Sequence, residues 1–328
     1  MKILVTGSAG HLGEALMRTL HTGQHEAIGI DVQPSRFTHA VGSIADRTFV
    51  ARCMSGVGAV LHTATLHKPH VVTHSQQAFV DTNITGTLNL LEEAAAAGVG
   101  SFVFTSTTSA FGRALTPAPG APAAWITEEV APLPKNIYGV TKIAAEGLCE
   151  LFQRQQGLPC IVLRTSRFFP EDDDRAQTRA DYLDANAKVN EFLHRRVDIE
   201  DVVDAHLLAI ERAPAIAFGR YIISATSPLR RDELAALRDN APVVVAAHVP
   251  AYEAEYRRRG WTMFPGIDRV YVNDKARREL GWQPRHDFAA VVERLRAGGD
   301  HRSALAQAIG LKGYHATPFA DGPYPVAP

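Results

Sequence analysis

The chain has 328 residues, of which 46% are hydrophobic and 21% charged, with a formal net charge of −1. This composition is typical of a globular protein with one large domain or two closely joined ones, and the balanced charge argues against a nucleic-acid partner. No apolar run approaches the length that spans a membrane, and the first expected strand starts without room for a signal peptide, so we expect a cytoplasmic protein. The three cysteines lack metal-binding spacing and are expected to be reduced thiols.

A glycine-rich turn follows the first expected strand, residues 3–5, and opens the first expected helix, residues 12–20. Gly7 permits the tight turn, Gly10 lets a pyrophosphate approach the backbone, and Gly13 lets the helix lie close to the sheet. The N–H groups at the start of the helix would face the phosphates. The turn therefore predicts a dinucleotide site that includes Gly7, Gly10, His11, Leu12 and Gly13.

An acidic residue, Asp31, ends the second expected strand, residues 27–30. A carboxylate there is placed to accept hydrogen bonds from the adenosine ribose, and it would repel a 2′-phosphate. Asp31 therefore favours NAD over NADP as the cofactor. Arg36 lies nearby in the sequence and keeps NADP open as the alternative.

Short apolar strands alternate with helical stretches through the first half of the chain. This alternation predicts an α/β fold, a Rossmann-type doubly wound parallel sheet with helices on both faces and a smaller C-terminal substrate-binding region. We expect residues 1–165 to form the NAD-binding domain, joined by residues 196–225, and residues 166–328 to form mainly the substrate-binding region. The expected strands are residues 3–5, 27–30, 59–62, 102–105 and 160–164, and the expected helices are 12–20, 46–54, 76–97 and 136–156.

Four histidines lie close together at and after the third expected strand: His62, His67, His70 and His74. Histidine is the commonest metal ligand, but Pro69 interrupts any helix that would align them, and no carboxylate or cysteine joins them at a suitable spacing. We therefore expect no metal, and we place His67 beside the cofactor or the substrate. The small residues that would let the chain pass close to a cofactor here are Thr63, Ala64 and Thr65.

Hydroxyl side chains run from Thr105 to Ser109 at the end of the fourth expected strand. Tyr138 and Lys142 follow, four positions apart, so on a helix they share one face. Such a pair is often only a pair of surface neighbours, but after a hydroxyl-rich strand end and a dinucleotide turn it is far more specific. Asn83 is an unfavourable residue within its expected helix, and its simplest interpretation is a side chain exposed to solvent.

Taken together, the motifs resemble the extended short-chain dehydrogenase/reductases, in particular the NAD-dependent epimerase/dehydratase family. The likeness runs in order along nearly the whole chain. The matching pieces are TGSAGHLG (6–13), Asp31, GSIAD (42–46), LHTAT (61–65), Asn83, FTSTTSAFG (104–112), YGVTK (138–142), Leu163-Arg164, VDIEDVVDAHLLAI (197–210) and ARRELGWQP (276–284).

The resemblance implies a catalytic triad of Thr107, Tyr138 and Lys142, supported by Asn83. It also implies that Ser43 and Ile44 lie against the adenine, although the family usually has Asp at the first of these positions. Tyr138 would take a proton from the substrate hydroxyl while Thr107 orients the same oxygen. The ammonium of Lys142 and an oxidised nicotinamide would lower the pKa of Tyr138 by about 3 units. The resemblance assigns Thr105, Tyr138 and Lys142 to the cofactor, and Thr107 and Thr108 to the substrate.

The second half of the chain is expected to bind the substrate. Arg167 leaves the fifth expected strand and could bind a carboxylate or a polyol, or it could pair with Asp172 or Asp173 and only close a loop. Residues 171–193 form a shorter stretch than in the nucleotide-sugar members of the family, which predicts a compact substrate, with an anionic one as an option, and no tight UDP binding. The tail from Gly310 is rich in Gly and Pro and is expected to lie on the surface as an arm.

Two of the expected helices carry apolar residues that we expect to face outward, which predicts a homodimer through a four-helix bundle. These residues are Leu88, Leu91 and Ala95 in the first helix, and Leu148, Leu151 and Phe152 in the second.

The function that these features predict is NAD-dependent hydride transfer at a secondary alcohol or ketone of a small polar, sugar-like substrate. The alternative is a nucleotide-sugar (UDP-sugar) 4-epimerase or dehydratase that holds its NAD tightly. A third reading, a regulator that only senses NAD, is disfavoured by the intact Thr107, Tyr138 and Lys142.

Overall fold

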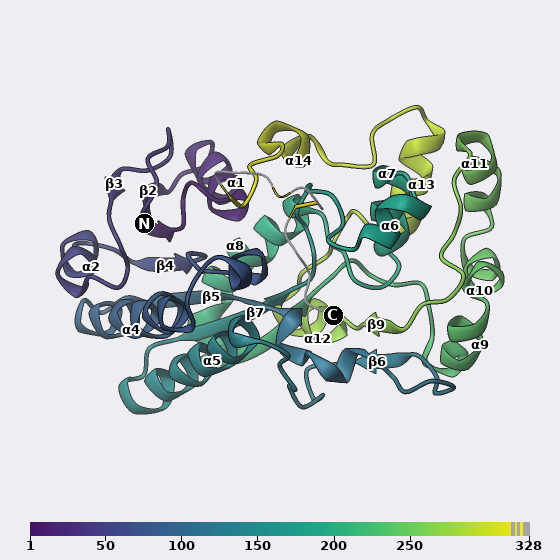
Figure 1. Ribbon diagram of the computed structural model, residues 1–328. Helices are drawn as coiled ribbons and strands as arrows, with labels where there is room; N and C mark the ends of the chain where they lie inside the picture. The colour runs from purple at the N-terminus through teal and green to yellow at the C-terminus, as the bar shows by residue number, and fades with distance from the viewer. Residues whose placement is uncertain (316–318, 320–321, 324–328) are drawn as a thin grey trace.

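A seven-stranded parallel sheet forms the centre of the computed structural model, which describes residues 1–315, 319 and 322–323 (Figure 1). The strand order is β3-β2-β1-β4-β5-β7-β8, and each neighbouring pair runs parallel. The strands are β1 (Lys2–Thr6), β2 (Glu26–Asp31), β3 (Ala40–Val41), β4 (Ala59–His62), β5 (Ser101–Thr107), β7 (Cys160–Thr165) and β8 (Phe218–Ile223).

The strand order reverses between β1 and β4. From β1 the chain builds outward to β2 and β3, and from β4 it builds in the opposite direction to β8. Connections therefore diverge at this point, and the carboxyl ends of β1 and β4 open a crevice between them. The predicted Rossmann-type, doubly wound sheet is confirmed.

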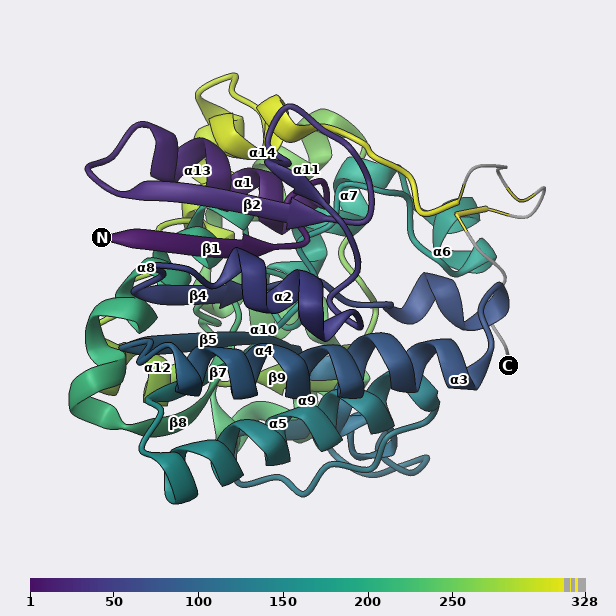
Figure 2. The same cartoon turned by 90° about the vertical axis from the view of Figure 1, so that its left-hand side faces the viewer.

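Alternate residues of the buried strands pack on opposite faces of the sheet. Ile3 and Val5 belong to a core formed with α1 (His11–His21), α8 (Ile199–Ile216) and α14 (Ala304–Ile309). Leu4 belongs to the core on the other face, under a second set of helices. That set is α2 (Arg47–Cys53), α4 (Gly86–Ala96) and α5 (Ile137–Gln156), and α4 and α5 lie side by side in front of the sheet in Figure 2.

The helix predicted over residues 76–97 is not one regular α-helix. It consists of α3 (Gln76–Phe79), a π-helical segment η2 (Val80–Thr85) and α4. The wider π turn carries Asn83, whose side chain is buried rather than exposed to solvent. π turns are rare and occur frequently at functional sites, and sequence periodicity does not reveal them.

Two residues of the predicted outward-facing stripe point inward instead. Leu91 and Phe152 are buried in the core under α4 and α5, because this side of each helix must cover the sheet. Leu88, Ala95 and Leu148 are only partly buried and pack at the edge of the same core.

The C-terminal part of the chain has a hydrophobic core of its own, built largely from residues after β7. A short parallel pair, β6 (Ala124–Ile126) with β9 (Arg269–Tyr271), joins the loop after β5 to this part. No helix in the described part of the chain is long and apolar enough to cross a membrane. The further helices are η1 (Lys68–Val72), η3 (Thr108–Phe111), η4 (Arg113–Leu115), α6 (Ala176–Asp181), α7 (Asp184–Glu191), η5 (Arg231–Glu233), α9 (Leu234–Asp239), α10 (Ala241–His248), α11 (Ala251–Arg259), α12 (Asp274–Leu280) and α13 (Phe288–Arg296).

Candidate active site

A cavity of about 710 Å³ runs along the carboxyl ends of the sheet strands. All of the predicted site residues line it except Asn83, which lies just behind its wall. The structure thus brings together Gly7, Gly10, His11, Leu12, Gly13, Asp31, Ser43, Ile44, Thr63, Ala64, Thr65, His67, Thr105, Thr107, Thr108, Tyr138, Lys142 and Arg167.

The glycine turn is shaped for a close backbone approach at the start of α1. Gly7 has a φ of 73°, and a Cβ there would lie 2.8 Å from the Ala64 backbone nitrogen. A Cβ on Gly13 would lie 1.9 Å from the carbonyl oxygen of Gly7, so neither position tolerates a side chain. Gly10 begins the helix, and no side chain of the described residues caps it. The first N–H groups of α1 therefore remain available to an anion such as a pyrophosphate.

Asp31 ends β2 at the rim of the cavity. Its two carboxylate oxygens accept hydrogen bonds from the Ala9 N–H at 2.9 Å and the Gln33 N–H at 2.8 Å, which fix the carboxylate beside the glycine turn. The Arg36 guanidinium instead lies 4.7 Å from the ring centre of Phe37 and does not line the cavity. The acidic group therefore dominates the place where an adenosine ribose would bind.

Asn83 holds the loop after β4 against α5. Its side-chain oxygen accepts the Leu66 N–H at 2.9 Å, and its amide group donates to the Leu66 carbonyl oxygen at 2.9 Å and to Thr141 Oγ1 at 3.0 Å. With 2% of its surface exposed, Asn83 is a positioning residue between the loop and the helix that carries Tyr138.

Tyr138 and Thr107 meet at the end of β5. The Asn136 side chain caps α5 by accepting the Gly139 N–H at 3.2 Å, which places Tyr138 in the first turn. Burial raises the pKa of Tyr138 to about 12, and a hydrogen bond with the Thr107 side chain opposes that shift. In the protein without NAD, burial therefore outweighs the hydrogen bond. The prediction that the Lys142 ammonium and an oxidised nicotinamide together lower this pKa concerns the NAD-bound protein and stays a prediction.

Lys142 lies one turn after Tyr138 and is buried as well. Its Nζ lies 4.1 Å from the ring centre of Phe104. Burial lowers the pKa of Lys142 to about 7, and the charge of Glu146 opposes that shift. The side chain therefore exchanges its proton near neutral pH, which suits a group that takes part in a proton path.

A buried network around Glu146, one helical turn after Lys142, was not predicted from the sequence. The Glu146 carboxylate accepts a hydrogen bond from Ser106 Oγ at 2.6 Å and forms an ion pair with Arg164 at 2.7 Å. The signal that could have found Glu146 is its spacing from Lys142, one turn further along the same helix.

The sequence of this chain also matches a known protein family. The model of the NAD dependent epimerase/dehydratase family matches residues 3–223. The chain belongs to this family. Its cofactor is NAD, and it is an enzyme of the extended short-chain dehydrogenase/reductase type.

Relatives of nearly full length include a reductase and an epimerase. The chain is 29% identical to a 2-alkyl-3-oxoalkanoate reductase of Stenotrophomonas maltophilia, over 90% of this chain and 99% of the relative. It is 26% identical to a UDP-glucose 4-epimerase of Rhizobium meliloti, over 89% and 94%. A short-chain dehydrogenase/reductase superfamily protein from Agrobacterium tumefaciens, solved with bound NAD, has the same fold with a TM-score of 0.63, at 23% identity over 91% of this chain and 98% of that one.

Of the four clustered histidines, His67, His70 and His74 have rings in contact with one another, and His62 is engaged separately. Both ring nitrogens of the buried His62 are engaged, by Thr6 Oγ1 at 2.8 Å and Thr87 Oγ1 at 2.9 Å. His74 lies outside the cavity, whereas His67 and His70 line it with their ring centres 4.6 Å apart, and His67 also stacks on Phe169 at 5.4 Å. His62 is therefore a structural core histidine, and His67 and His70 are the members that a ligand would meet.

Arg167 reaches the cavity but is engaged by acidic groups. Its guanidinium donates to Asp173 at 2.7 Å and lies 3.4 Å from Glu191, which also pairs with Arg195 at 2.6 Å. Of the two arrangements considered from the sequence, the structure contains the ion pair with Asp173. Arg175 lines the same side, is exposed, and forms no ion pair with a described residue.

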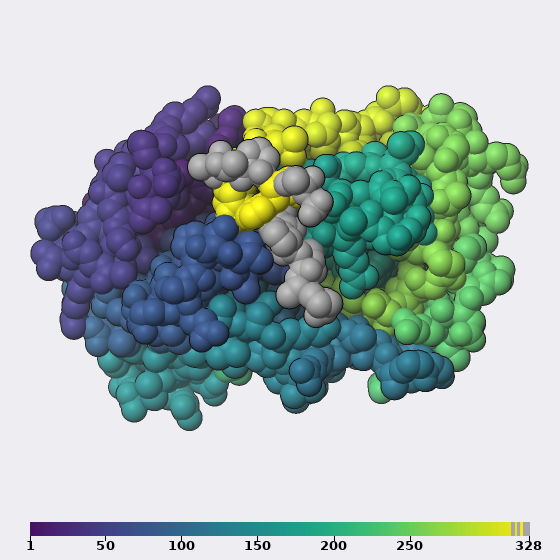
Figure 3. Space-filling view, viewed as in Figure 1, coloured from purple at the N-terminus to yellow at the C-terminus, as the bar shows by residue number. Residues whose placement is uncertain are grey.

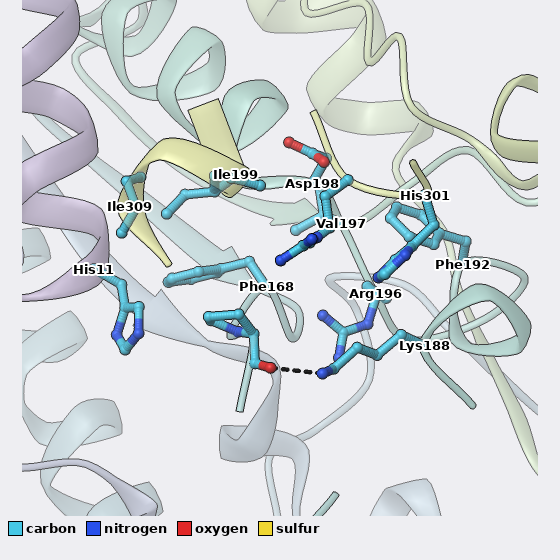
Figure 4. A pocket seen from close by; sticks show the side chains of 13 residues that line it. His11, Phe168, Lys188, Phe192, Arg196, Val197, Asp198, Ile199, His301 and Ile309 are labelled. Carbon is cyan, nitrogen blue, oxygen red and sulfur yellow. Dashed lines mark hydrogen bonds between the residues drawn. The ribbon is translucent and has the colours of Figure 1, made fainter. Parts of the chain in front are cut away.

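A second, much smaller cavity lies beside the first and shares His11 and Phe168 with it (Figure 4). Its volume of about 30 Å³ has room for about two water molecules. The Lys188 ammonium at its edge donates to the Pro170 carbonyl oxygen at 2.5 Å, so this charge already has a partner. The small cavity is too small for a substrate of this family.

The segment after α14 also contributes to the large cavity, which sequence analysis did not predict. Lys312, Gly313 and Tyr314 line it, although the tail was expected to be a surface arm. In Figure 3 the yellow atoms of this part of the chain lie between the purple and blue N-terminal half and the teal segment after β7. The rest of the expected arm, apart from residues 319 and 322–323, lies outside the described residues.

Proposed function

We propose that this protein is an oxidoreductase that uses NAD to transfer a hydride at a secondary alcohol or ketone of a small, polar, sugar-like substrate. The observation that carries the proposal is that Tyr138 and Thr107 line the same cavity as the buried Lys142 and the glycine turn. A regulator that only senses NAD would have no use for this constellation.

The proposed chemistry divides the work among three side chains. Tyr138 takes the proton of the substrate hydroxyl, Thr107 orients the same oxygen, and Lys142 receives or returns a proton behind Tyr138. When bound, NAD supplies the hydride acceptor and, in its oxidised form, a positive charge that favours the phenolate of Tyr138. That charge is needed because burial holds the pKa of Tyr138 at about 12 in the protein alone.

Several arginines line the substrate side of the cavity, which supports a compact anionic substrate such as a sugar acid. Arg167 and Arg195 are already engaged by Asp173 and Glu191, so we assign substrate contact first to Arg175. A guanidinium without an ion pair at the rim can bind a carboxylate in a two-point geometry.

The alternative is a nucleotide-sugar 4-epimerase or dehydratase that keeps its NAD bound throughout. It is favoured by the similarity to UDP-glucose 4-epimerase over 89% of this chain. An epimerase returns its hydride to the substrate, so it accumulates no NADH, whereas a dehydrogenase must exchange the cofactor at each turnover.

The first test is the substitution Tyr138→Phe, assayed by NADH formation. We expect turnover to fall about 10²–10⁴-fold, because acid–base groups typically contribute this much. NAD affinity should change little. The control is Tyr252→Phe, which should retain full turnover, because Tyr252 lies outside the cavity and its hydroxyl donates to the Pro242 carbonyl oxygen. Turnover of more than about a tenth of the wild-type value would exclude Tyr138 as the base.

The second test identifies the substrate class. A panel of sugars and sugar acids is offered with NAD, and the NAD-loaded protein is titrated with UDP and UDP-glucose by calorimetry. We expect NADH from a sugar acid, and Arg175→Gln should raise KM for it more than for a neutral sugar. A dissociation constant for UDP below about 100 μM, or about 5.5 kcal/mol of binding, would favour the epimerase instead.

We also propose that the protein works in the cytoplasm as a homodimer that pairs α4 and α5 of each subunit. Val140 on α5 supports this, because 48% of its surface is exposed, next to the partly buried Leu148 side of the same helix. Pairing across a two-fold axis would cover this apolar stripe.

A further inference from the structure

The segment that follows α14 crosses the dinucleotide cavity and is attached to both of its rims. On one rim the Lys312 ammonium donates to the Ala9 carbonyl oxygen at 2.9 Å and to the Glu14 carboxylate at 2.5 Å. On the other rim the ring of His315 contacts the carbonyl oxygen of Pro69 in η1 at 3.1 Å. Residues 311–315 therefore span the opening above the glycine turn.

One buried carboxylate, Glu171, fastens the middle of this segment. Its oxygens accept hydrogen bonds from the backbone N–H groups of Lys312 and Gly313, both at 3.2 Å, and from the Tyr314 hydroxyl at 3.1 Å. The same carboxylate lies 2.8 Å from His11 Nε2 at the start of α1. Glu171 thus links the segment directly to the first helical residue after the glycine turn.

The ring of Tyr314 completes this attachment with apolar contacts. Its centre lies 5.1 Å from that of His67 and 5.9 Å from that of Phe169, and both of these side chains line the cavity. The Tyr314 ring therefore forms part of the cavity wall, and a dinucleotide bound there would contact this ring instead of solvent.

The charge on Lys312 also has an electrostatic role at this place. Glu14 lies in the first turn of α1, where a pyrophosphate would bind, and a bare carboxylate there would repel it. Burial alone would raise the pKa of Glu14, but its partners Lys312 and Arg18 lower it, so the carboxylate is ionised and neutralised by these cations. Loss of Lys312 would leave more of that negative charge facing the phosphates.

We propose that residues 311–315, held by Glu171, form a strap that closes over bound NAD and must detach before the cofactor leaves. The strap controls how long the cofactor stays, and Lys312 and Tyr314 are the residues that hold it shut. This inference rests on NAD binding in the cavity, which belongs to the proposed function, but not on the identity of the substrate.

The test measures the rate of NADH release rather than turnover. NADH-loaded protein is mixed with excess NAD, and the loss of NADH fluorescence is followed by stopped flow. We expect the double variant Lys312→Met/Tyr314→Phe to release NADH at least tenfold faster than the wild type. Leu311→Ala is the matched control, because Leu311 lies in the same segment with 71% of its surface exposed, and its rate should stay within twofold of the wild type.

A second measurement follows the strap itself. Lys312 is the last lysine or arginine in the sequence, so trypsin cleavage after it releases one defined peptide, residues 313–328. We expect saturating NAD to slow the release of this peptide from the wild type, and to have a smaller effect in the single variant Tyr314→Phe, which keeps the cleavage site at Lys312.

Equal NADH release from the double variant and the wild type would overturn the strap, and so would trypsin cleavage that does not respond to NAD. Either result would leave the proposed oxidoreductase intact, because the Tyr138→Phe assay tests that separately. A wild-type protein that binds no NADH would overturn both.

Discussion

At the scale of single residues, Asp31 and Arg36 compete to set the cofactor. Asp31 is fixed at the cavity rim by two backbone N–H groups, and Arg36 packs on Phe37 away from it. We therefore expect a kcat/KM at least tenfold higher with NAD than with NADP, measured on the same substrate. Asp31→Asn should narrow this ratio, and Arg36→Ala should leave it unchanged. Equal efficiencies in the wild type would mean that a cation governs the ribose site.

Lys142 makes the stability of the cofactor-free protein depend on pH in a defined direction. Burial lowers its pKa to about 7, whereas in the unfolded chain it stays near 10.5. Between these values the unfolded chain binds more protons, so stability rises with pH across this window and falls as pH drops towards 7. From about pH 7 to about pH 9, the free energy of unfolding should rise by about 2 kcal/mol more in the wild type than in Lys142→Met. If urea titrations gave the same change in the free energy of unfolding with pH for the wild type and for Lys142→Met, this prediction would be contradicted.

The residues that sequence reasoning placed best are those that follow a local pattern. The glycine turn, Asp31 and the Tyr138–Lys142 pair each have a spacing that fixes their geometry, and all of them line one cavity. The pKa of Tyr138 could not be predicted, because it depends on burial by residues distant in sequence. Lys312 was missed for the same reason, since its hydrogen bond to Ala9 joins parts of the chain separated by 303 positions.

At the scale of elements, α1 shows how closely a helix can approach the turn before it. A Cβ on Gly13 would lie 1.9 Å from the Gly7 carbonyl oxygen, so Gly13→Ala must push the helix away from the turn. We expect a loss of about 1–3 kcal/mol in the free energy of unfolding, together with weaker NAD binding.

The control for this variant lies just past the other end of the same helix. A Cβ on Gly23 would meet its nearest atom, the Leu20 carbonyl oxygen, at an ordinary 3.5 Å. Gly23→Ala should therefore change stability by less than about 0.5 kcal/mol. Equal effects of the two substitutions in thermal unfolding would show that the close contact at Gly13 is relieved without cost.

The elements themselves were predicted well where apolar runs and turn residues coincide. The five expected strands are all present, each within a few residues of its expected bounds. Strand β8 was expected only within the stretch 196–225 that joins the NAD-binding domain, without bounds of its own. The short strands β3, β6 and β9 were not predicted, because two or three residues carry no readable alternation. The π turn at Asn83 was missed because its side-chain hydrogen bonds are tertiary contacts with Leu66 and Thr141.

For the whole molecule, the proposed dimer gives a measurable mass. Light scattering at micromolar concentration should give twice the 35.6 kDa of one chain. Val140→Glu should reduce the mass to that of a monomer, because it places a charge in the proposed apolar interface. Val243→Glu is the matched control, since Val243 on α10 is also exposed, at 63%, but lies outside α4 and α5. A wild-type monomer would exclude the four-helix bundle.

The long-range contact between Ala9 and Lys312 also has a consequence for folding kinetics. The separation of 303 positions means that this contact closes a loop of nearly the whole chain. Contacts of high sequence separation cost the most loop entropy, so they tend to form late, after the strands and helices near each other in sequence have assembled. On refolding from denaturant, the far-ultraviolet signal of the sheet and helices should therefore return before slow NADH release does.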